Sequence, residues 1–394
     1  MKSVLILGGG FAGLEAAIYL RKAAYDVTLL SNREYLYIYP TSIWIPTQEI
    51  SFSDACIDLN KLKKVHGFNL IIDEVEAIDA KNNSYMLKSK KVLEGYSHVI
   101  LAMGSSKTKH AGREKTLSIC GEPSEAVLMR EKIEELVKNG SGKISFGFGS
   151  NPRDTSAVRG GPAFEVLFNV HNMLKKKGIR DNFELTFFAP MAEPGKRMGS
   201  KALKKLKAMF EKMNIKQQLG KKIKQFESGA IIFEDESKIE SDLIMFIPAG
   251  DGHEVVKKSD LPKNEAGFVI IDDFCRVTLE GSDAPSNIYA IGDIAALSGA
   301  EWRAKQGHIA EVMARNTAYN IVQKDNGKSE FKGYAEHINI LCVMDSGDGA
   351  TVVYRDDSKA FMIWLPLLGH WLKKGWGKYF RLSKLGKIPR IPGM

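Results

Sequence analysis

The sequence predicts an α/β protein with two Rossmann-like domains, followed by a C-terminal amphipathic region. Three features predict this: an apolar run that ends in a glycine-rich turn near the N-terminus, a second such run in mid-chain, and a basic, aromatic tail. The chain of 394 residues is long enough for two or three domains with full hydrophobic cores. Its apolar content of 44% and charged content of 26% are those of an ordinary globular protein.

The first feature lies in residues 3–15. An apolar run, Val4–Leu7, predicts a buried parallel strand, and a Gly-x-Gly-x-x-Gly pattern follows it directly. Gly8 allows the tight turn, Gly10 lets the backbone approach a pyrophosphate, and Gly13 lets helix and strand pack closely. A helix from Leu14 to Lys22 then directs its N-terminus at the phosphates. The residues expected at this dinucleotide site are Gly8, Gly10, Phe11, Ala12 and Gly13.

The segment after the first helix carries the adenosine side of the expected site. A second strand, residues 27–30, ends without the acidic residue that usually holds a ribose, so we expect Ser31 and Asn32 to hydrogen-bond it. Residues 35–40, with Trp44, form an aromatic-rich loop that either packs on the surface or lines a pocket for a flat ring.

Residues 69–105 predict three further strands. Residues 69–80 and 83–88 alternate like antiparallel strands. Residues 97–105 read as a buried strand that ends in a turn of small residues, Ala102 to Ser105.

The second feature is a βαβ unit within residues 108–265. Residues 143–149 form its first strand and turn, but residues 150–160 intervene before a helix begins near Pro162. The third glycine of an NADH fingerprint is therefore missing, and the strand at 184–190 ends without an acidic residue for a ribose. Two independent requirements for NADH binding fail.

Charge is concentrated at the C-terminus. Residues 361–394 carry seven basic and no acidic residues, so +7 of the total net charge of +9 lies there and only +2 in the rest of the chain. This distribution argues against a nucleic-acid-binding protein. No run of 18 apolar residues and no signal peptide is recognised, and no metal site is expected, because the four cysteines lie far apart without a CxxC pair.

The tail itself is the third feature. From 367 to 385, leucine and aromatic residues recur at three- and four-residue spacing, with lysines and Arg381 between them. This composition is typical of a helix that lies in a membrane interface, with its apolar side in the lipid and its cations toward anionic headgroups. The alternative is a basic helix that docks on its own domain or on a partner.

Three motifs in order resemble the FAD motifs of two-dinucleotide-domain flavoprotein disulfide reductases, which have the glutathione-reductase-like fold. They are the N-terminal glycine pattern, the strand that ends in Leu101-Ala102-Met103-Gly104, and Asn287-Ile288-Tyr289-Ala290-Ile291-Gly292-Asp293. The resemblance implies FAD, with Ala102, Gly104 and Gly292 beside it and Asp293 bonded to its ribityl chain. It implies an FAD domain of residues 1–107 and 266–335, a second Rossmann-like domain of 108–265, and a C-terminal domain of 336–394.

The whole chain resembles sulfide:quinone oxidoreductases and flavocytochrome c sulfide dehydrogenase. The matching stretches are Thr28 to Tyr35, Leu117 to Cys120, Gly161 to Glu165, Lys305 to Gly307, and Ile340 to Asp345. In that family sulfide attacks a cysteine disulfide beside the flavin, and electrons leave to a quinone. Cys342 matches the C-terminal redox cysteine, and Cys120 matches an additional N-terminal one.

The other member of the usual redox pair is absent. Arg159 stands where the family has a cysteine, two residues before the glycine of Gly-Pro-Ala-Phe-Glu. Either Cys120 and Cys342 act together, or the protein oxidises another donor, or the change inactivates it. Arg159 either binds an anionic donor near the flavin or is a solvated loop residue.

Two charged residues complete the site that the resemblance implies. Glu165, in the first turn of the second-domain helix, takes a proton-transfer role toward quinone, or merely complements the helix dipole. Lys305 opens a helix that runs to Val322 and places a positive charge near the flavin pyrimidine. Tyr37, Ile38 and Tyr39 are expected on the quinone side.

The resemblance thus predicts a monotopic, membrane-associated FAD enzyme that passes electrons from sulfide, or a related sulfur nucleophile, to a membrane quinone. Residues 361–394 would contact the membrane, and a homo-oligomer stays open. The alternatives are a type II NADH:quinone oxidoreductase, which the broken second glycine motif disfavours, and a non-catalytic flavin-binding subunit that docks on the membrane.

Overall fold

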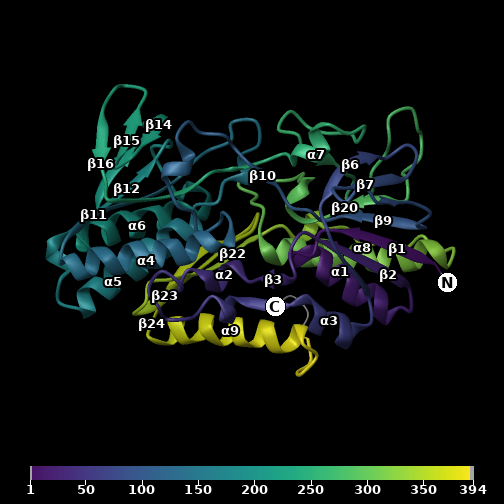
Figure 1. Ribbon diagram of the computed structural model, residues 1–394, viewed down its shortest axis with the longest axis horizontal. Helices are drawn as coiled ribbons and strands as arrows, with labels where there is room; N and C mark the ends of the chain where they lie inside the picture. The colour runs from purple at the N-terminus through teal and green to yellow at the C-terminus, as the bar shows by residue number, and fades with distance from the viewer. Residues whose placement is uncertain (1, 391–394) are drawn as a thin grey trace.

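The computed structural model describes residues 2–390, and two parallel sheets lie toward opposite ends of its long axis (Figure 1). The first sheet has the order β20 (Ile288–Ala290), β9 (His98–Leu101), β1 (Ser3–Leu7), β2 (Asp26–Ser31) and β5 (Asn69–Ile72). Helices α1 (Phe11–Lys22) and α8 (Gly307–Asp325) pack against each other beside it. All four residues Val4–Leu7 are fully buried, as expected of a central strand in a parallel sheet.

The second sheet confirms the predicted mid-chain unit. Its order is β13 (Lys216–Leu219), β12 (Phe183–Ala189), β11 (Gly142–Phe148) and β17 (Leu243–Ile247), all parallel. Helices α4 (Pro123–Asn139), α5 (Gly161–Lys176) and α6 (Ser200–Lys212) accompany it. A stack of phenylalanines that includes Phe164, Phe187 and Phe210 fills the space between sheet and helices.

Small antiparallel sheets lie outside the two parallel sheets. They are β3 (Tyr35–Tyr37) with β4 (Cys56–Asp58), β6 (Val75–Asp79) with β7 (Ser84–Leu87) and β8 (Val92–Leu93), β10 (Ser106–Lys107) with β18 (Gly250–Asp251), and β14 (Ile223–Glu227) with β15 (Ala230–Phe233) and β16 (Lys238–Glu240). Two short parallel strands, β19 (Val269–Ile270) and β21 (Ala295–Ala296), pair with each other, and short helices α2 (Tyr39–Ser42), α3 (Leu59–His66) and α7 (Glu254–Lys257) connect the strands.

One strand prediction and one loop prediction were wrong in part. Residues 69–72 form β5, which is parallel to β2, rather than the start of an antiparallel strand. The chain then leaves this sheet at Asp73, and only β6 to β8 pair as antiparallel strands. The aromatic segment is not a plain loop, because β3 and α2 lie within it and Trp44 is only 1% exposed.

The C-terminal region combines a sheet with one long helix. Strands β22 (Ile340–Asp345), β23 (Gly349–Arg355) and β24 (Ala360–Pro366) form an antiparallel sheet, and α9 (Leu368–Lys384) packs on it. In Figure 1, α9 runs in yellow along one long edge of the molecule. The part of the tail at residues 391–394 lies outside the described residues.

The prediction that the cations of the tail point away from the protein was wrong for several of them. Lys384 is fully buried and pairs with Glu15 and Glu311, because an ammonium inside the protein requires carboxylate partners. Arg390 contacts the same two carboxylates. One side of α9 is therefore docked on α1 and α8, as the alternative reading of the tail expected.

Candidate active site

A cavity of about 2230 Å³ opens where the two sheets, β22 and α9 meet. Most predicted site residues line it: Gly8, Gly10, Phe11, Ala12, Ser31, Asn32, Tyr37, Tyr39, Ala102, Gly104, Cys120, Arg159, Glu165, Gly292, Asp293, Lys305 and Cys342. Ile38 does not line it; this side chain is 1% exposed and packs in the core of the first domain. Gly13 lies behind the turn rather than on the cavity wall.

The N-terminal glycines build a backbone cradle at one end of the cavity. Gly8 has a φ of +121°, and a Cβ there would lie 2.3 Å from the carbonyl oxygen of Ala102. A Cβ on Gly13 would lie 1.8 Å from the carbonyl oxygen of Gly8, so both positions require glycine. Around Gly10, by contrast, the space within 4 Å is open. The first turn of α1 therefore presents its backbone N–H groups to the cavity, where a pyrophosphate is favoured.

The adenosine end of the cradle has its polar groups in place. Ser31 is buried at the end of β2, where its hydroxyl bonds the backbone of Arg33, and Asn32 beside it lines the cavity. The structure therefore brings both predicted ribose partners to the wall of the cavity. Ser31 is already hydrogen-bonded within its own loop.

The far end of the cradle carries Asp293 and Arg159. Gly292 has a φ of +73°, which turns the chain after β20 so that Asp293 faces the cavity. The Asp293 carboxylate forms an ion pair with Arg159. Because the Arg159 side chain is 25% exposed and paired, it is not a freely solvated loop residue.

Lys305 precedes helix α8 rather than opening it, since α8 begins at Gly307 with Gln306 as its cap. Its ammonium donates to the carbonyl oxygen of Ala295 and lies 4.0 Å from the centre of the Phe268 ring. Burial lowers the pKa of Lys305 to about 7. Next to it, the buried Oε1 of Gln306 has no hydrogen-bond partner among residues 2–390.

Cys120 and Cys342 are the two cysteines on the cavity wall; Cys56 and Cys275 are not part of it. All four are free thiols in this structure. Burial raises the pKa of Cys342 to about 12. Burial also raises the pKa of Cys120, and the nearby cations of Arg159 and Lys107 oppose that rise.

Glu165 sits one turn inside α5, so it is not the dipole partner at the helix start that the sequence left open. Its side chain is 5% exposed and forms an ion pair with Lys373 of α9, and its Oε1 accepts the backbone N–H of Asp345 at 2.8 Å. Burial raises the pKa of Glu165, which the Lys373 charge opposes. Both contacts fall on Oε1, which leaves Oε2 as the oxygen that can exchange a proton with a molecule in the cavity.

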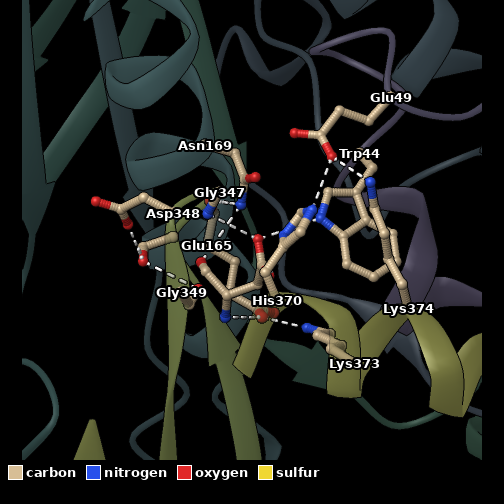
Figure 2. Close-up of polar contacts among 12 residues, drawn as sticks. Trp44, Glu49, Glu165, Asn169, Gly347, Asp348, Gly349, His370, Lys373 and Lys374 are labelled. Carbon is tan, nitrogen blue, oxygen red and sulfur yellow. Dashed lines mark hydrogen bonds and ion pairs between the residues drawn. The ribbon is translucent and has the colours of Figure 1, made fainter. Parts of the chain in front are cut away.

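A second polar group lies behind Glu165, and Figure 2 shows the side chains of Glu49, His370 and Lys374 converging beside Trp44. His370 Nδ1 bonds the Asp345 carboxylate at 2.7 Å, and His370 Nε2 lies 3.3 Å from Glu49. Trp44 Nε1 donates to Asp345 at 3.2 Å. We call Glu49, Asp345, His370 and Lys374 the His370 array.

Sequence reasoning missed Lys373 and the His370 array. Lys373 and His370 were part of a helix expected to face lipid, and Asp345 and Glu49 lie more than 20 residues away from them along the chain. No regular sequence spacing links these residues. They could have been sought on physical grounds, because a buried glutamate such as Glu165 requires a cation from elsewhere in the chain.

The end of α9 that faces the cavity also carries an exposed apolar surface. Leu368, Trp371 and Leu372 line the cavity mouth and are 66%, 67% and 50% exposed. Leu367, Phe361 and Ile363 extend this surface onto β24. No helix among residues 2–390 is long and apolar enough to cross a membrane.

The residues present fit FAD. The glycine cradle leaves room for a pyrophosphate at Gly10, and the unpartnered Gln306 Oε1 offers an acceptor at the other end of the same cavity. The second domain is built differently, because residues 149–160 separate the end of β11 at Phe148 from the start of α5 at Gly161, and a Cβ on Gly160 would lie 2.7 Å from the Phe148 ring. That aromatic ring packs on the backbone where α5 begins.

Comparison with known proteins agrees with this geometry. A sequence profile of the family described as pyridine nucleotide-disulphide oxidoreductase matches residues 2–317. The chain is 27% identical to a sulfide-quinone reductase of Aquifex aeolicus, over 96% of this chain and 90% of that protein. It is 22% identical to a type II NADH:quinone oxidoreductase of Staphylococcus epidermidis, over 90% of each.

Solved structures show the same fold. The sulfide:quinone oxidoreductase of Aquifex aeolicus superposes with a TM-score of 0.84 at 23% identity, covering 98% of this chain and 92% of that one. The Plasmodium falciparum NDH2 with NADH superposes with a TM-score of 0.75 at 14% identity, covering 98% and 96%. The resemblance predicted from the sequence is confirmed, and the chain belongs to the pyridine nucleotide-disulphide oxidoreductase family as an FAD-dependent oxidoreductase.

Proposed function

We propose that this protein is a sulfide:quinone oxidoreductase that works at a membrane surface. The observation that carries the proposal is that one cavity holds the glycine cradle, Cys120 and Cys342, and the carboxylate of Glu165. We also propose the division into an FAD domain of residues 1–107 and 266–335, a second domain of 108–265, and a C-terminal domain of 336–394.

The overall reaction balances with one proton taken up. HS⁻ gives zero-valent sulfur, a proton and two electrons, and a quinone takes two electrons and two protons to become a quinol. FAD, when bound in the cradle, carries the two electrons from donor to acceptor. The residues that would hold it are Gly8, Gly10, Phe11, Ala12, Gly13, Ser31, Asn32, Ala102, Gly104, Gly292, Asp293 and Lys305.

On the donor side, Cys120 and Cys342 replace the usual pair of this family. HS⁻ attacks a disulfide between them, which breaks the S–S bond and leaves a persulfide on one sulfur and a thiolate on the other. Arg159 and Lys107 lie near Cys120 and favour the thiolate, and their charges attract an anionic donor. Arg159 thus takes an electrostatic role where the family has a cysteine.

On the acceptor side, Glu165 holds a proton for the quinone at Oε2. A partly desolvated carboxylate with a raised pKa is suited to general acid catalysis near neutral pH. Lys373, on the same wall, supplies a positive charge, which stabilises negative charge that develops on a quinone oxygen. Tyr37 and Tyr39, which contact each other edge to face, line the same cavity.

The exposed apolar surface of α9 and β24 supports the membrane part of the proposal. Leucine and tryptophan side chains at a cavity mouth can enter the lipid interface and give a lipid-soluble quinone a path to the cavity. Lys378, exposed on the same helix, adds a charge that suits anionic headgroups.

The test is anaerobic. Sulfide or, in a separate experiment, NADH is added to the purified holoenzyme. The absorbance band of the flavin cofactor at ~450 nm is then followed. We expect sulfide to bleach the band and a short-chain ubiquinone to restore it. Bleaching by NADH alone would overturn the proposal in favour of an NADH:quinone oxidoreductase, the class of the Staphylococcus relative. No bleaching by either would favour a non-catalytic flavin subunit.

A further inference from the structure

The ionisable groups between Glu165 and the protein surface form a connected set. Three acidic side chains, Glu49, Asp345 and Glu165, contact three basic ones, His370, Lys373 and Lys374. In Figure 2 the side chains of Glu49, Glu165, His370, Lys373 and Lys374 lie close together, on α5, α9 and the loop around Trp44. Asp345 of β22 contacts Glu165 and His370. The inner members of this set are buried, and Glu49 and Lys374 reach solvent at 24% and 27% exposure.

Asp345 joins the inner and outer parts of this set. Its backbone N–H donates to Oε1 of Glu165 at 2.8 Å, and its carboxylate is fully buried. Three donors fix that carboxylate: His370 Nδ1 at 2.7 Å, Trp44 Nε1 at 3.2 Å and the backbone N–H of Gly347 at 2.9 Å. These three contacts, together with the pairing of Asp345 with Ala350 of β23, fix the Asp345 peptide and so its bond to Glu165.

Of the three groups that donate to the Asp345 carboxylate, His370 is the one that carries a full positive charge, and it lies on α9. Lys373 stands one turn later on the same helix and contacts the same Oε1 of Glu165. His370 therefore fixes both partners of that oxygen, one through Asp345 and one through the position of α9. Asp345 and Glu49 together raise the pKa of His370 to about 9, so the imidazole is charged at neutral pH.

We propose that His370 is a positioning residue for quinone reduction: through its Nδ1 contact with Asp345 it holds Oε1 of Glu165, so that Oε2 faces the cavity with its proton. This inference rests on the proposed function, since it assigns the support of the proton donor in that reaction. The other contact of His370, from Nε2 to Glu49, lies toward the protein surface. We propose that it is not required for the orientation of Glu165.

The two nitrogens of His370 can be tested separately. Asparagine places its amide near the position of Nδ1, and glutamine near that of Nε2, so H370N keeps the Asp345 contact and H370Q keeps the Glu49 contact. Each holoenzyme is reduced anaerobically with dithionite and mixed with a short-chain ubiquinone, which bypasses the sulfide half of the reaction. We expect H370Q to be reoxidised about tenfold more slowly and H370N within about twofold of wild type.

A double variant distinguishes positioning from general loss of structure. If His370 acts through Glu165, then E165Q/H370Q is no slower than E165Q alone, because the same step is already lost. D345N, which weakens the same contact from the other side, should match H370Q in rate, and E49Q should match H370N. D345N also provides a second measurement if H370Q does not fold.

Three outcomes overturn the inference: H370Q at the wild-type rate, H370N and H370Q slowed equally, or additive losses in the double variant. Failure of the proposed function looks different. In that case sulfide does not bleach the flavin of the wild-type protein, whereas the dithionite assay still measures the effect of His370 on reoxidation by quinone. A wild-type protein whose reduced flavin the quinone does not reoxidise would overturn the role of His370 as well.

Discussion

At the scale of single residues, the ion pair between Arg159 and Asp293 joins two residues for which the sequence predicted separate roles. The sequence predicted that Asp293 holds a ribityl chain and left Arg159 as either an anion ligand or a loop residue. The structure pairs them across the cavity, 134 positions apart in the chain. Arg159 thereby brings a positive charge to the donor side, next to Cys120.

Among the proposed site residues, Glu165 should affect the rate of quinone reduction most directly. We expect E165Q to slow reoxidation of the reduced flavin by quinone by about 100-fold, the usual contribution of a general acid. Stopped-flow absorbance measures this rate. Reduction by sulfide should be unchanged, and an E165Q protein with normal quinone kinetics would contradict the role of Oε2.

The charge of His370 predicts how stability depends on pH. Hydrogen bonds to Asp345, then to Glu49, raise its pKa from 6.5 to about 9, so the folded state holds this proton more tightly than the unfolded chain. The stabilisation is complete below pH 6.5 and is lost as the pH rises through about 9. Urea unfolding of the wild type and H370N at several pH values measures it. A wild type that loses no more stability than H370N from pH 7 to pH 9 would contradict the assignment.

At the scale of elements, helix α9 has one side that packs on the protein and one side that is exposed. Gly377 and Phe380 face the protein, where Phe380 stacks on Phe11 with ring centres 4.9 Å apart. Leu368, Trp371 and Leu372 face outward at the cavity mouth. A periodicity of three to four residues predicts an amphipathic helix correctly, but it does not say which side meets protein and which meets lipid, because both partners are apolar.

The buried end of α9 should be a main contribution to stability. Lys384 lies between Glu15 and Glu311 without solvent exposure, and K384M leaves these carboxylates with Arg390 alone. We expect a loss of about 3 kcal/mol in the free energy of unfolding, as for other broken buried ion pairs. The exposed Lys378 on the same helix is the matched control, and K378M should change stability by less than about 0.5 kcal/mol. Equal effects would contradict the burial of Lys384.

The outer side of α9 can be tested with lipid vesicles. We expect L368E/W371E to lower binding to vesicles of anionic phospholipid by about tenfold or more, because two large apolar side chains are lost from the interface. Leu128 on α4, 49% exposed, is the control position, and L128E should bind as the wild type does. Sedimentation with vesicles measures both. Unchanged binding of the double variant would place the membrane surface elsewhere.

At the scale of the whole molecule, much of the fold was predictable and part of the site was not. Strands β1, β2, β9, β11 and β12 and the glycine cradle follow from local apolar runs and turn residues, which act over a few positions, whereas β13 and β17 were not predicted. Asp345 and Lys373 were missed, because their partner Glu165 lies 180 and 208 positions away along the chain. His370 was missed because it contacts Asp345 and Glu49 only when α9 packs on the protein. Local patterns carry no information about such pairs.

One cavity is lined by Cys120 and Cys342, which we propose for the donor reaction, and by Glu165 and Lys373, which we propose for the acceptor reaction. Coupling of these two reactions is the central claim. The most direct measurement is the amount of quinol formed per sulfide consumed, anaerobically, with a short-chain ubiquinone, in wild type, C342S and the control C56S, whose cysteine is not on the cavity. We predict one quinol per sulfide for wild type and C56S, and none for C342S. Quinol formation by C342S at the wild-type yield would contradict the account.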